Sequence, residues 1–129
     1  MRTGLDTSVV VRLLVGEPAA QTKAAWAAVA DAAPVVVSDL VISEAYHVLR
    51  HHYAIAHADA IAGLRALLSD ARVQTTGVAG EVLGALSGAE AGPGFMDRMI
   101  HADYRRADAE LLTFDRAATR LPDTRLLSE

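Results

Sequence analysis

Short apolar runs alternate along the chain with longer segments in which apolar residues recur at helical spacing. The run Val35-Val36-Val37 is typical of a strand that is buried on both faces. Other short strands are predicted at 2–6, 72–76, 110–114 and 125–127, and helices at 9–15, 19–33, 39–53, 57–69, 81–90 and 95–106. Strands that alternate with helices predict an α/β fold with a parallel sheet covered by helices on both faces.

Capping residues and helix breakers give these elements their expected bounds. Ser8 is expected to cap the first helix, which ends at Gly16-Glu17-Pro18. Ser38 or Asp39 is expected to cap the helix that follows the valine run. The segment Gly92-Pro93-Gly94 predicts a sharp break before the last long helix.

Composition limits the class of protein. A chain of 129 residues predicts one domain, 1–129, and a composition of 52% hydrophobic and 22% charged residues predicts a globular protein rather than a disordered one. No apolar run approaches the roughly 20 residues of a membrane span, and the first residues lack the apolar core of a signal peptide. Cysteine is absent, which excludes disulfides and thiolate metal sites. We therefore expect a cytoplasmic protein without a membrane partner.

The charges are unevenly distributed. The formal net charge of −4 argues against broad, purely electrostatic binding of nucleic acid. Lys23 is the only lysine, so the other cations are arginines, which bind phosphate in a planar, bidentate manner. A solvated surface is the ordinary interpretation of such arginines. Six of them fall late in the chain: Arg98, Arg105, Arg106, Arg116, Arg120 and Arg125.

Three acids occupy positions that call for an explanation. Asp6 and Asp115 each close an apolar strand, and the carboxyl ends of parallel strands are where α/β proteins bind ligands. Glu44 shares one helix face with Leu40 and Val48 by its spacing, which predicts a carboxylate inside an apolar stripe. A buried carboxylate is costly without a partner. Strand-to-helix capping for the two aspartates and an ion pair for Glu44 are the ordinary alternatives.

A fourth acid, Asp97, lies in the first turn of the last long helix, where negative charge is favoured in any case. Taken with the other three acids, Asp97 makes a shared ligand-binding site a better explanation than four separate caps and ion pairs. Four carboxylates that met at one sheet edge would repel each other unless a cation joined them. Oxygen ligands without cysteine suit a hard ion such as Mg²⁺ or Mn²⁺.

The four acids lie in segments that resemble, in order and spacing, the motifs of PIN-domain nucleases. These segments are Asp6-Thr7-Ser8, Ser43-Glu44-Ala45, the stretch from Asp97 to Ala102, and Thr113-Phe114-Asp115-Arg116. The resemblance spans essentially the whole chain. In size and layout the chain is most similar to VapC toxins of bacterial toxin–antitoxin pairs.

The resemblance implies a PIN-like three-layer α/β/α sandwich with a central parallel sheet and an acidic pocket that holds Mg²⁺ or Mn²⁺. It implies an endoribonuclease that acts on RNA, is neutralised by a VapB-like antitoxin and forms a homodimer. The residues it implies as metal-binding and catalytic are Asp6, Glu44, Asp97 and Asp115, with Ser8 and Thr113 as supporting hydroxyls and Arg98 and Arg116 as contacts to the RNA backbone.

The last motif departs from the family pattern. Many relatives carry another acid and an aromatic residue after its Asp-Arg, whereas Ala117 and Ala118 follow here. The resemblance therefore implies no fifth acidic ligand from this segment, and whether the site holds one metal ion or two stays open. Asp103 and Asp108 are acids without an assigned role, for which the surface is the expected place.

Other functions stay open at this stage. The chain can be a PIN nuclease of RNA maturation outside a toxin system, or a non-catalytic module that binds RNA or protein and uses its acids as caps and ion pairs. His47 and His51 have a spacing that can hold zinc, but no glutamate stands beside His47 as the metalloprotease pattern requires. Tyr46, Leu49 and Tyr53 are expected on a surface that contacts a second copy or an antitoxin.

Overall fold

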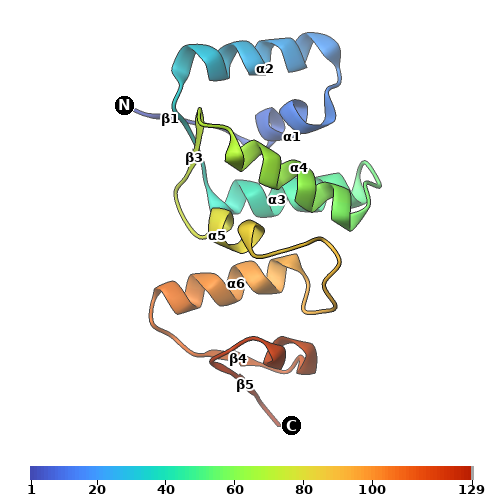
Figure 1. The fold of residues 1–129 in the computed structure, drawn as a ribbon, viewed down its shortest axis with the longest axis vertical. Helices are drawn as coiled ribbons and strands as arrows, with labels where there is room; N and C mark the ends of the chain where they lie inside the picture. The colour runs from blue at the N-terminus through green and yellow to red at the C-terminus, as the bar shows by residue number, and fades with distance from the viewer. Residues whose placement is uncertain (129) are drawn as a thin grey trace.

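The computed structural model describes residues 1–128 (Figure 1). No helix in this described part is long and apolar enough to cross a membrane. The elements, in chain order, are β1 (Thr3–Gly4), α1 (Thr7–Val15), α2 (Ala19–Ala32), β2 (Val35–Val37), α3 (Asp39–His51), α4 (His57–Ser69), β3 (Val73–Thr75), α5 (Ala79–Gly84), α6 (Phe95–Arg106), β4 (Leu111–Thr113), the 3-10 helix η1 (Arg116–Arg120) and β5 (Thr124–Leu126).

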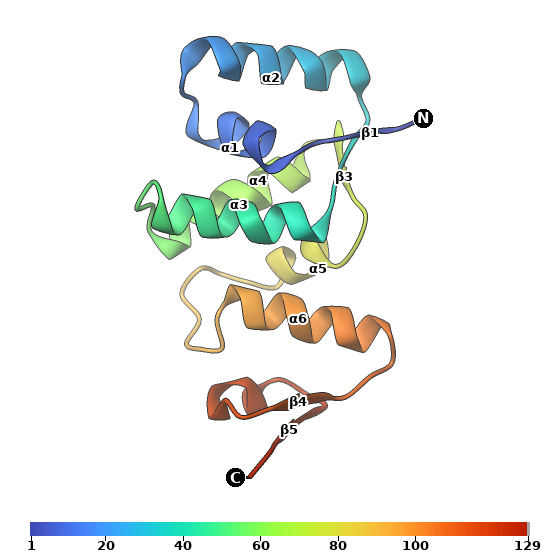
Figure 2. The same cartoon turned by 180° about the vertical axis from the view of Figure 1, so that it is seen from behind.

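All strand pairs are parallel, as the alternation of strands and helices predicts, and the mixed α/β class is confirmed. The strands fall into two groups, however. One sheet has the order β1-β2-β3, with Val35 opposite Thr3 on one side and Val73 on the other. The second sheet contains β4 and β5, with Leu111 opposite Thr124. Both ribbon views place α6 between the two groups (Figures 1 and 2).

The core is built around the central strand β2. Val35 and Val37 have no exposed surface, because a central strand under helices buries its side chains. Helix α3 directs Ile42, Ala45 and Leu49 into this core, and α1, α2, α4, α5 and α6 contribute the rest. The largest fully buried side chains are Phe95, Ile42, Ile61, Leu64, Leu83, Val10, Val29, Val35 and Val37.

Helix α1 begins one residue earlier than its predicted cap. The backbone carbonyl of Asp6 accepts hydrogen bonds from the N–H groups of Val9 and Val10, at 3.1 and 3.2 Å, so Asp6 is the N-cap. Ser8 lies inside the first turn, and the prediction that it caps the helix is wrong. The predicted stop is confirmed, because Gly16 adopts a left-handed conformation (φ +82°) that ends the helix.

The sequence left open whether Ser38 or Asp39 caps α3, and the structure shows that each of them caps a different helix. Ser38 Oγ accepts the N–H of Val41 at 3.2 Å and caps α3. Asp39 instead caps a different helix, because its two carboxylate oxygens accept the N–H groups of Val78 and Ala79 at 2.9 and 3.0 Å. This contact fixes the start of α5 against the start of α3.

Helix α5 is shorter than the helix predicted over 81–90, and that prediction is wrong for 85–90. Glu90 turns back and accepts hydrogen bonds from Ser87 Oγ and from the N–H of Gly88, both at 2.8 Å. Desolvation by itself raises the pKa of Glu90, but the hydrogen bonds from Ser87 and Gly88 outweigh it and lower the pKa to about 2. The segment is therefore a loop organised around an ionised carboxylate.

Candidate functional site

Asp6 lies at the carboxyl edge of the three-stranded sheet, where it follows β1 after a single residue. Its side chain is exposed, and Ser8 Oγ donates a hydrogen bond to Asp6 Oδ2 at 3.1 Å. The extended backbone of Asp6 (φ −76°, ψ 161°) begins α1 while leaving its carboxylate available to solvent. The structure thus places this acid where a ligand of an α/β protein binds.

Glu44 lies on the outer face of α3, which corrects the prediction of a carboxylate inside an apolar stripe. Its neighbour along the face, Leu40, is 83% exposed, and Glu44 itself is exposed. The core face of α3 instead contains Ile42, Ala45 and Leu49. Both faces carry apolar residues at helical spacing, and only the tertiary packing shows which one is buried.

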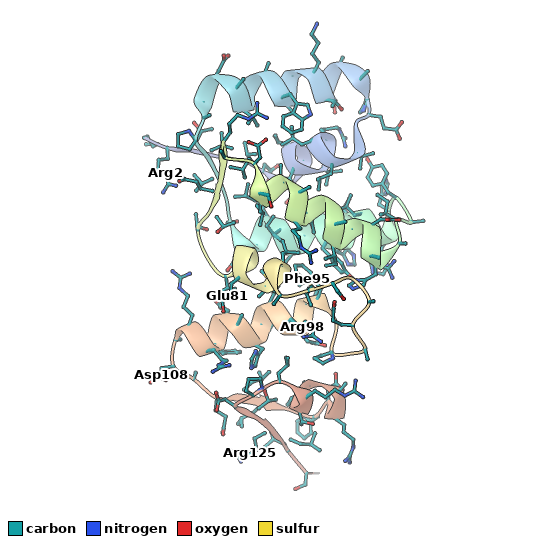
Figure 3. All side chains as sticks on the ribbon, in the orientation of Figure 1. Arg2, Glu81, Phe95, Arg98, Asp108 and Arg125 are labelled. Atoms are coloured by element: carbon teal, nitrogen blue, oxygen red, sulfur yellow. The ribbon has the colours of Figure 1, made fainter. Side chains whose placement is uncertain are left out.

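Asp97 lies half-buried in the first turn of α6. Phe95 and Arg98 lie in the first turn of this helix (Figure 3), and both contact neighbouring residues. Phe95 is buried and its ring lies 4.7 Å from the ring of Tyr46, centroid to centroid. Arg98 Nε donates to the carbonyl of Pro93 at 2.9 Å, which ties the helix to the preceding loop. The predicted contact of Arg98 with RNA stays a prediction. Part of its guanidinium already donates this hydrogen bond to Pro93.

Asp115 follows β4 and caps η1, since its Oδ1 accepts the N–H of Ala117 at 3.0 Å. Thr113 Oγ1 accepts the N–H of Asp115 at 2.9 Å and orders the same turn. Asp115 therefore does cap a helix, which is the ordinary alternative that the sequence analysis gives for this acid. Arg116, the first residue of η1, is exposed.

A single chain does not bring the predicted acids to one place. Asp6 and Asp115 follow strands of different sheets, because β4 pairs with β5 and not with β1. Within residues 1–128, no three acidic or histidine side chains gather into a group that could hold a metal ion. The assignment of Asp6, Glu44, Asp97 and Asp115 to metal binding and catalysis stays a prediction. Asp103 and Asp108 are exposed, as expected.

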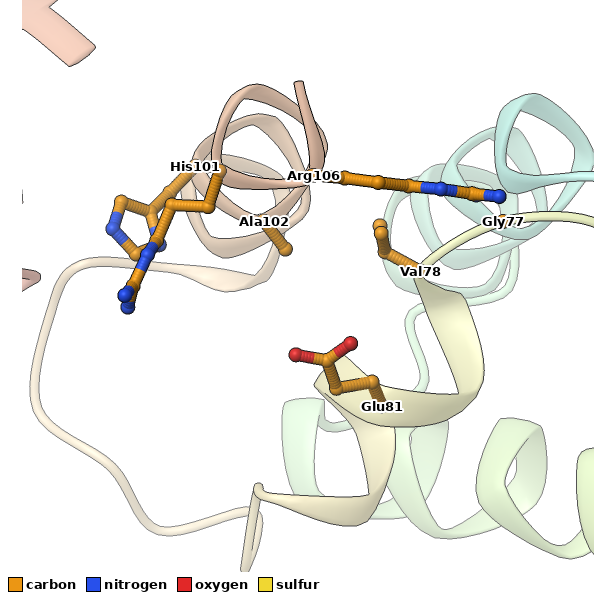
Figure 4. Close-up of a pocket in the computed structure, with 7 residues that line it drawn as sticks. Gly77, Val78, Glu81, His101, Ala102 and Arg106 are labelled. Carbon is orange, nitrogen blue, oxygen red and sulfur yellow. The ribbon is translucent and has the colours of Figure 1, made fainter. Parts of the chain in front are cut away.

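A cleft of about 580 Å³ lies between α5 and α6, and its lining residues do not include the four predicted acids (Figure 4). Its polar lining comes from Glu81 on α5 and from His101, Arg105 and Arg106 on α6. The imidazole of His101 is buried, and its Nε2 donates to the carbonyl of Pro122 at 2.6 Å. The sequence signals the basic side of this cleft only as two adjacent arginines, because the loop between α5 and α6 sets how the two helices face each other.

Several of the late arginines hold the C-terminal segment rather than projecting freely. Arg105 pairs with Asp123 at 3.4 Å, and Arg120 Nη1 donates to the carbonyl of Gly92 at 2.6 Å. Within the second sheet, Arg125 pairs with Glu110 at 3.1 Å.

The predicted contact surface of Tyr46, Leu49 and Tyr53 is also internal in part. Leu49 is buried, Tyr46 hydrogen-bonds His57 Nδ1 at 2.7 Å, and Tyr53 accepts from Arg12 at 3.3 Å. The expectation that Tyr46, Leu49 and Tyr53 form a contact surface is therefore wrong for Leu49.

Comparison with known proteins assigns the family. No curated protein and no solved structure matches the chain. The sequence model of one family, described as the PIN domain, matches residues 5–123, which include all four predicted acids. PIN domains are generally nucleases and typically use divalent metal ions. The match extends over nearly the whole chain, so this protein belongs to the PIN domain family.

Proposed function

We propose that this PIN domain is a metal-dependent endoribonuclease that hydrolyses RNA phosphodiester bonds. The observation that carries the proposal is the position of Asp6. Within a chain of the PIN family, this acid stands at the carboxyl edge of a parallel sheet, exposed, with the hydroxyl of Ser8 hydrogen-bonded to its carboxylate. A carboxylate oriented in this way is suited to a hard cation.

The chemistry of the predicted residues fits Mg²⁺ or Mn²⁺. All four are carboxylates, and Mg²⁺ usually takes one or two protein carboxylates and keeps several waters. Such an ion polarises phosphoryl oxygens and lowers the pKa of a bound water. Asp6, Asp97 and Asp115 would hold it, while Glu44 would add a carboxylate or orient the attacking water.

The remaining residues act by positioning. Ser8 orients the Asp6 carboxylate by its 3.1 Å hydrogen bond, and Thr113 fixes the backbone of Asp115 at 2.9 Å. Asp115 uses Oδ1 to cap η1, which leaves Oδ2 for a second contact. Arg98 and Arg116 would supply charge for the RNA backbone.

We further propose that the chain is the toxin of a VapBC-type pair and that a VapB-like antitoxin neutralises it. The motif order, the size of the chain and its layout support this assignment. Expression of the protein alone should arrest growth, and co-expression of a small neighbouring reading frame should relieve the arrest. A nuclease of RNA maturation would produce no arrest that such a frame relieves.

The nuclease activity is tested by cleavage of a structured RNA. The Asp6→Asn variant should lose activity by about 100-fold or more in Mg²⁺ or Mn²⁺, because a ligand is lost while the fold is kept. Asp31→Asn on α2 is the matched control, since Asp31 is exposed on a helix without a predicted acid. A chelator should abolish the activity of the parent protein.

A binding module is the outcome that would replace this proposal. The capping role of Asp115 is the observation that favours it. Such a module would bind the RNA without cutting it, and its binding would be unchanged by chelator and by Asp6→Asn.

A further inference from the structure

A second cavity, of about 210 Å³, lies between the end of α3, the start of α4 and the loop before α6. Both ribbon views place the α3–α4 turn and this loop on the same side of the molecule (Figures 1 and 2). The polar lining comes from Tyr46 and Arg50 on α3, His57 on α4, Glu90 in the loop and Arg98 on α6. The lining residues do not include the four predicted acids, so the cavity is a separate feature of the molecule.

Two half-buried guanidinium groups give this cavity a positive charge. Within residues 1–128, neither Arg50 nor Arg98 forms an ion pair with a carboxylate. Glu90 is the one carboxylate among the described lining residues, and its oxygens accept the N–H groups of Ser87 and Gly88 in its own loop. Two positive charges therefore face one negative charge in a partly buried site, where salt screens them less than at an open surface. An anionic ligand would balance the difference.

Backbone carbonyls hold both guanidinium groups in position. Arg50 Nη1 donates to the carbonyl of Ile55 at 2.9 Å, and Arg98 Nε donates to the carbonyl of Pro93, also at 2.9 Å. Figure 3 shows Arg98 beside the loop that precedes α6. These contacts order the side chains without neutralising their charge, and each guanidinium keeps further N–H groups for a ligand. A ligand thus meets arginines that are already ordered, which lowers the entropic cost of binding.

The imidazole of His57 supplies a donor from a third element. Tyr46 Oη lies 2.7 Å from His57 Nδ1, and the ring of Tyr46 packs on the ring of Phe95 with 4.7 Å between the centroids. With the tyrosine hydroxyl as the donor in this contact, the proton of the neutral imidazole is on Nε2, which can then donate to an anion. The donors of the cavity therefore come from α3, α4 and α6.

We propose that this cavity binds a phosphate group, held by Arg50, His57 and Arg98. A phosphate directs its oxygens to several sides at once, which suits donors from three elements, and arginine matches its geometry. Pockets for drug-sized ligands have roughly 300–1,000 Å³, so a cavity of about 210 Å³ suits a phosphate group rather than a whole nucleotide. The group is inorganic phosphate or the terminal phosphate of an RNA that continues outside the cavity. The phosphate site does not depend on the proposed nuclease activity.

Isothermal titration calorimetry with inorganic phosphate tests the site. A chelator is present throughout, so that no phosphate bound through a metal ion is counted. The parent should bind phosphate in a saturable manner, and Arg50→Gln should weaken the affinity by about tenfold or more, because a charge-assisted hydrogen bond is lost. Arg125→Gln, on the exposed face of β5, removes the same charge as a matched control and should leave the affinity unchanged. Arg98 is kept, because the proposed nuclease also uses it.

Gly94→Asp is a second variant, which leaves the contact between Arg50 and Ile55 intact. Gly94 lines the cavity and is the N-cap of α6, with a φ of −76° that any residue adopts, and a Cβ there meets no atom within 4 Å. Aspartate is favoured at an N-cap, so the variant should fold at least as stably as the parent. Its carboxylate adds a negative charge to the lining and should weaken phosphate binding by about tenfold or more.

Short RNAs identify the source of the phosphate. Displacement of inorganic phosphate by an RNA with a terminal phosphate, but not by the same RNA with hydroxyl ends, would assign the cavity to an RNA end. Displacement by neither RNA would assign it to inorganic phosphate.

Several results would overturn the phosphate site. These are the absence of saturable phosphate binding, an affinity for acetate equal to that for phosphate, equal displacement by the two RNAs, an equal loss in Arg50→Gln and Arg125→Gln, and unchanged binding in Gly94→Asp. None of these measurements requires RNA cleavage, so an inactive parent protein would refute the proposed nuclease and leave the phosphate site to be decided by the titrations.

Discussion

The role of each carboxylate in this protein depends on what already occupies its oxygens. Both oxygens of Asp39 accept backbone N–H groups at the start of α5, and one oxygen of Asp115 accepts the N–H of Ala117. Asp6 accepts a hydrogen bond from the hydroxyl of Ser8, and its side chain stays exposed to solvent. Among these three residues, Asp39 is thus structural. Asp115 uses one oxygen as a helix cap and keeps the other for a ligand, and Asp6 caps no N–H group with its carboxylate and is the best placed to bind a ligand.

Asp70 gives a residue-scale prediction that is independent of function. A side-chain hydrogen bond from Arg72 lowers the pKa of Asp70 from 3.8 to about 2, and Arg72 lies 5.4 Å from the ring centroid of Trp26. Because the pKa is lowered in the folded protein, the ion pair is intact above pH 3.8 and is lost as the pH falls through about 2. Fluorescence of Trp26, the only tryptophan, should change with a midpoint near pH 2.

The Asp70→Asn variant is the control for this titration. It should show the low-pH fluorescence signal already at neutral pH and have no transition near pH 2. A parent midpoint close to 3.8, the ordinary value, would contradict the assignment of the ion pair.

At the scale of elements, the contact between α3 and α5 shows how a distant residue sets a helix boundary. Asp39 lies about 40 positions before the N–H groups that it caps. Gly77 stands directly beside this carboxylate, and a Cβ at that position would come within 2.1 Å of Asp39 Oδ2. The glycine is therefore required by the close approach of the two helix starts.

Gly77→Ala should lower the free energy of unfolding by about 1–2 kcal/mol, the usual cost of losing a helix cap, in a denaturant titration. Gly84→Ala at the end of α5 is the matched control, because a Cβ there meets no atom within 4 Å. We expect it to be neutral or slightly stabilising, since alanine favours helix. In an Asp39→Ala background the cost of Gly77→Ala should largely disappear, and a cost that persisted there would argue against the contact.

The same elements show what local pattern can and cannot predict. The helices over 57–69 and 95–106 and the strand 35–37 were predictable, because periodicity and β-branched runs are local signals. The bounds of α5 were not, since its start depends on Asp39 and the segment after it is organised around Glu90. The buried face of α3 was also beyond reach, because Leu40 and Val48 mark an apolar face as convincingly as Ile42 and Leu49 do.

At the scale of the whole molecule, the division of the strands into two sheets is the feature that sets where the predicted acids lie. The four acids could be proposed as site residues from the sequence, and all of them lie within residues 5–123, which match the PIN domain. Their assembly could not, because it depends on whether β4 pairs with β1, a long-range contact of two very short strands.

Light scattering checks the homodimer that the resemblance to VapC toxins implies. The parent should have twice the 13.6 kDa mass of the chain. A parent protein that is monomeric at high concentration would contradict this expectation.

The most direct test of the central claim is to map the RNA ends that the protein generates in total cellular RNA. The parent and the Asp6→Asn variant are compared in Mg²⁺ and with a chelator. We predict defined cleavage sites for the parent in Mg²⁺, and none for the parent with chelator or for Asp6→Asn under either condition. Equal cleavage by parent and variant, or cleavage that persists in the chelator, would contradict the claim that this PIN domain cuts RNA with a metal ion held at Asp6.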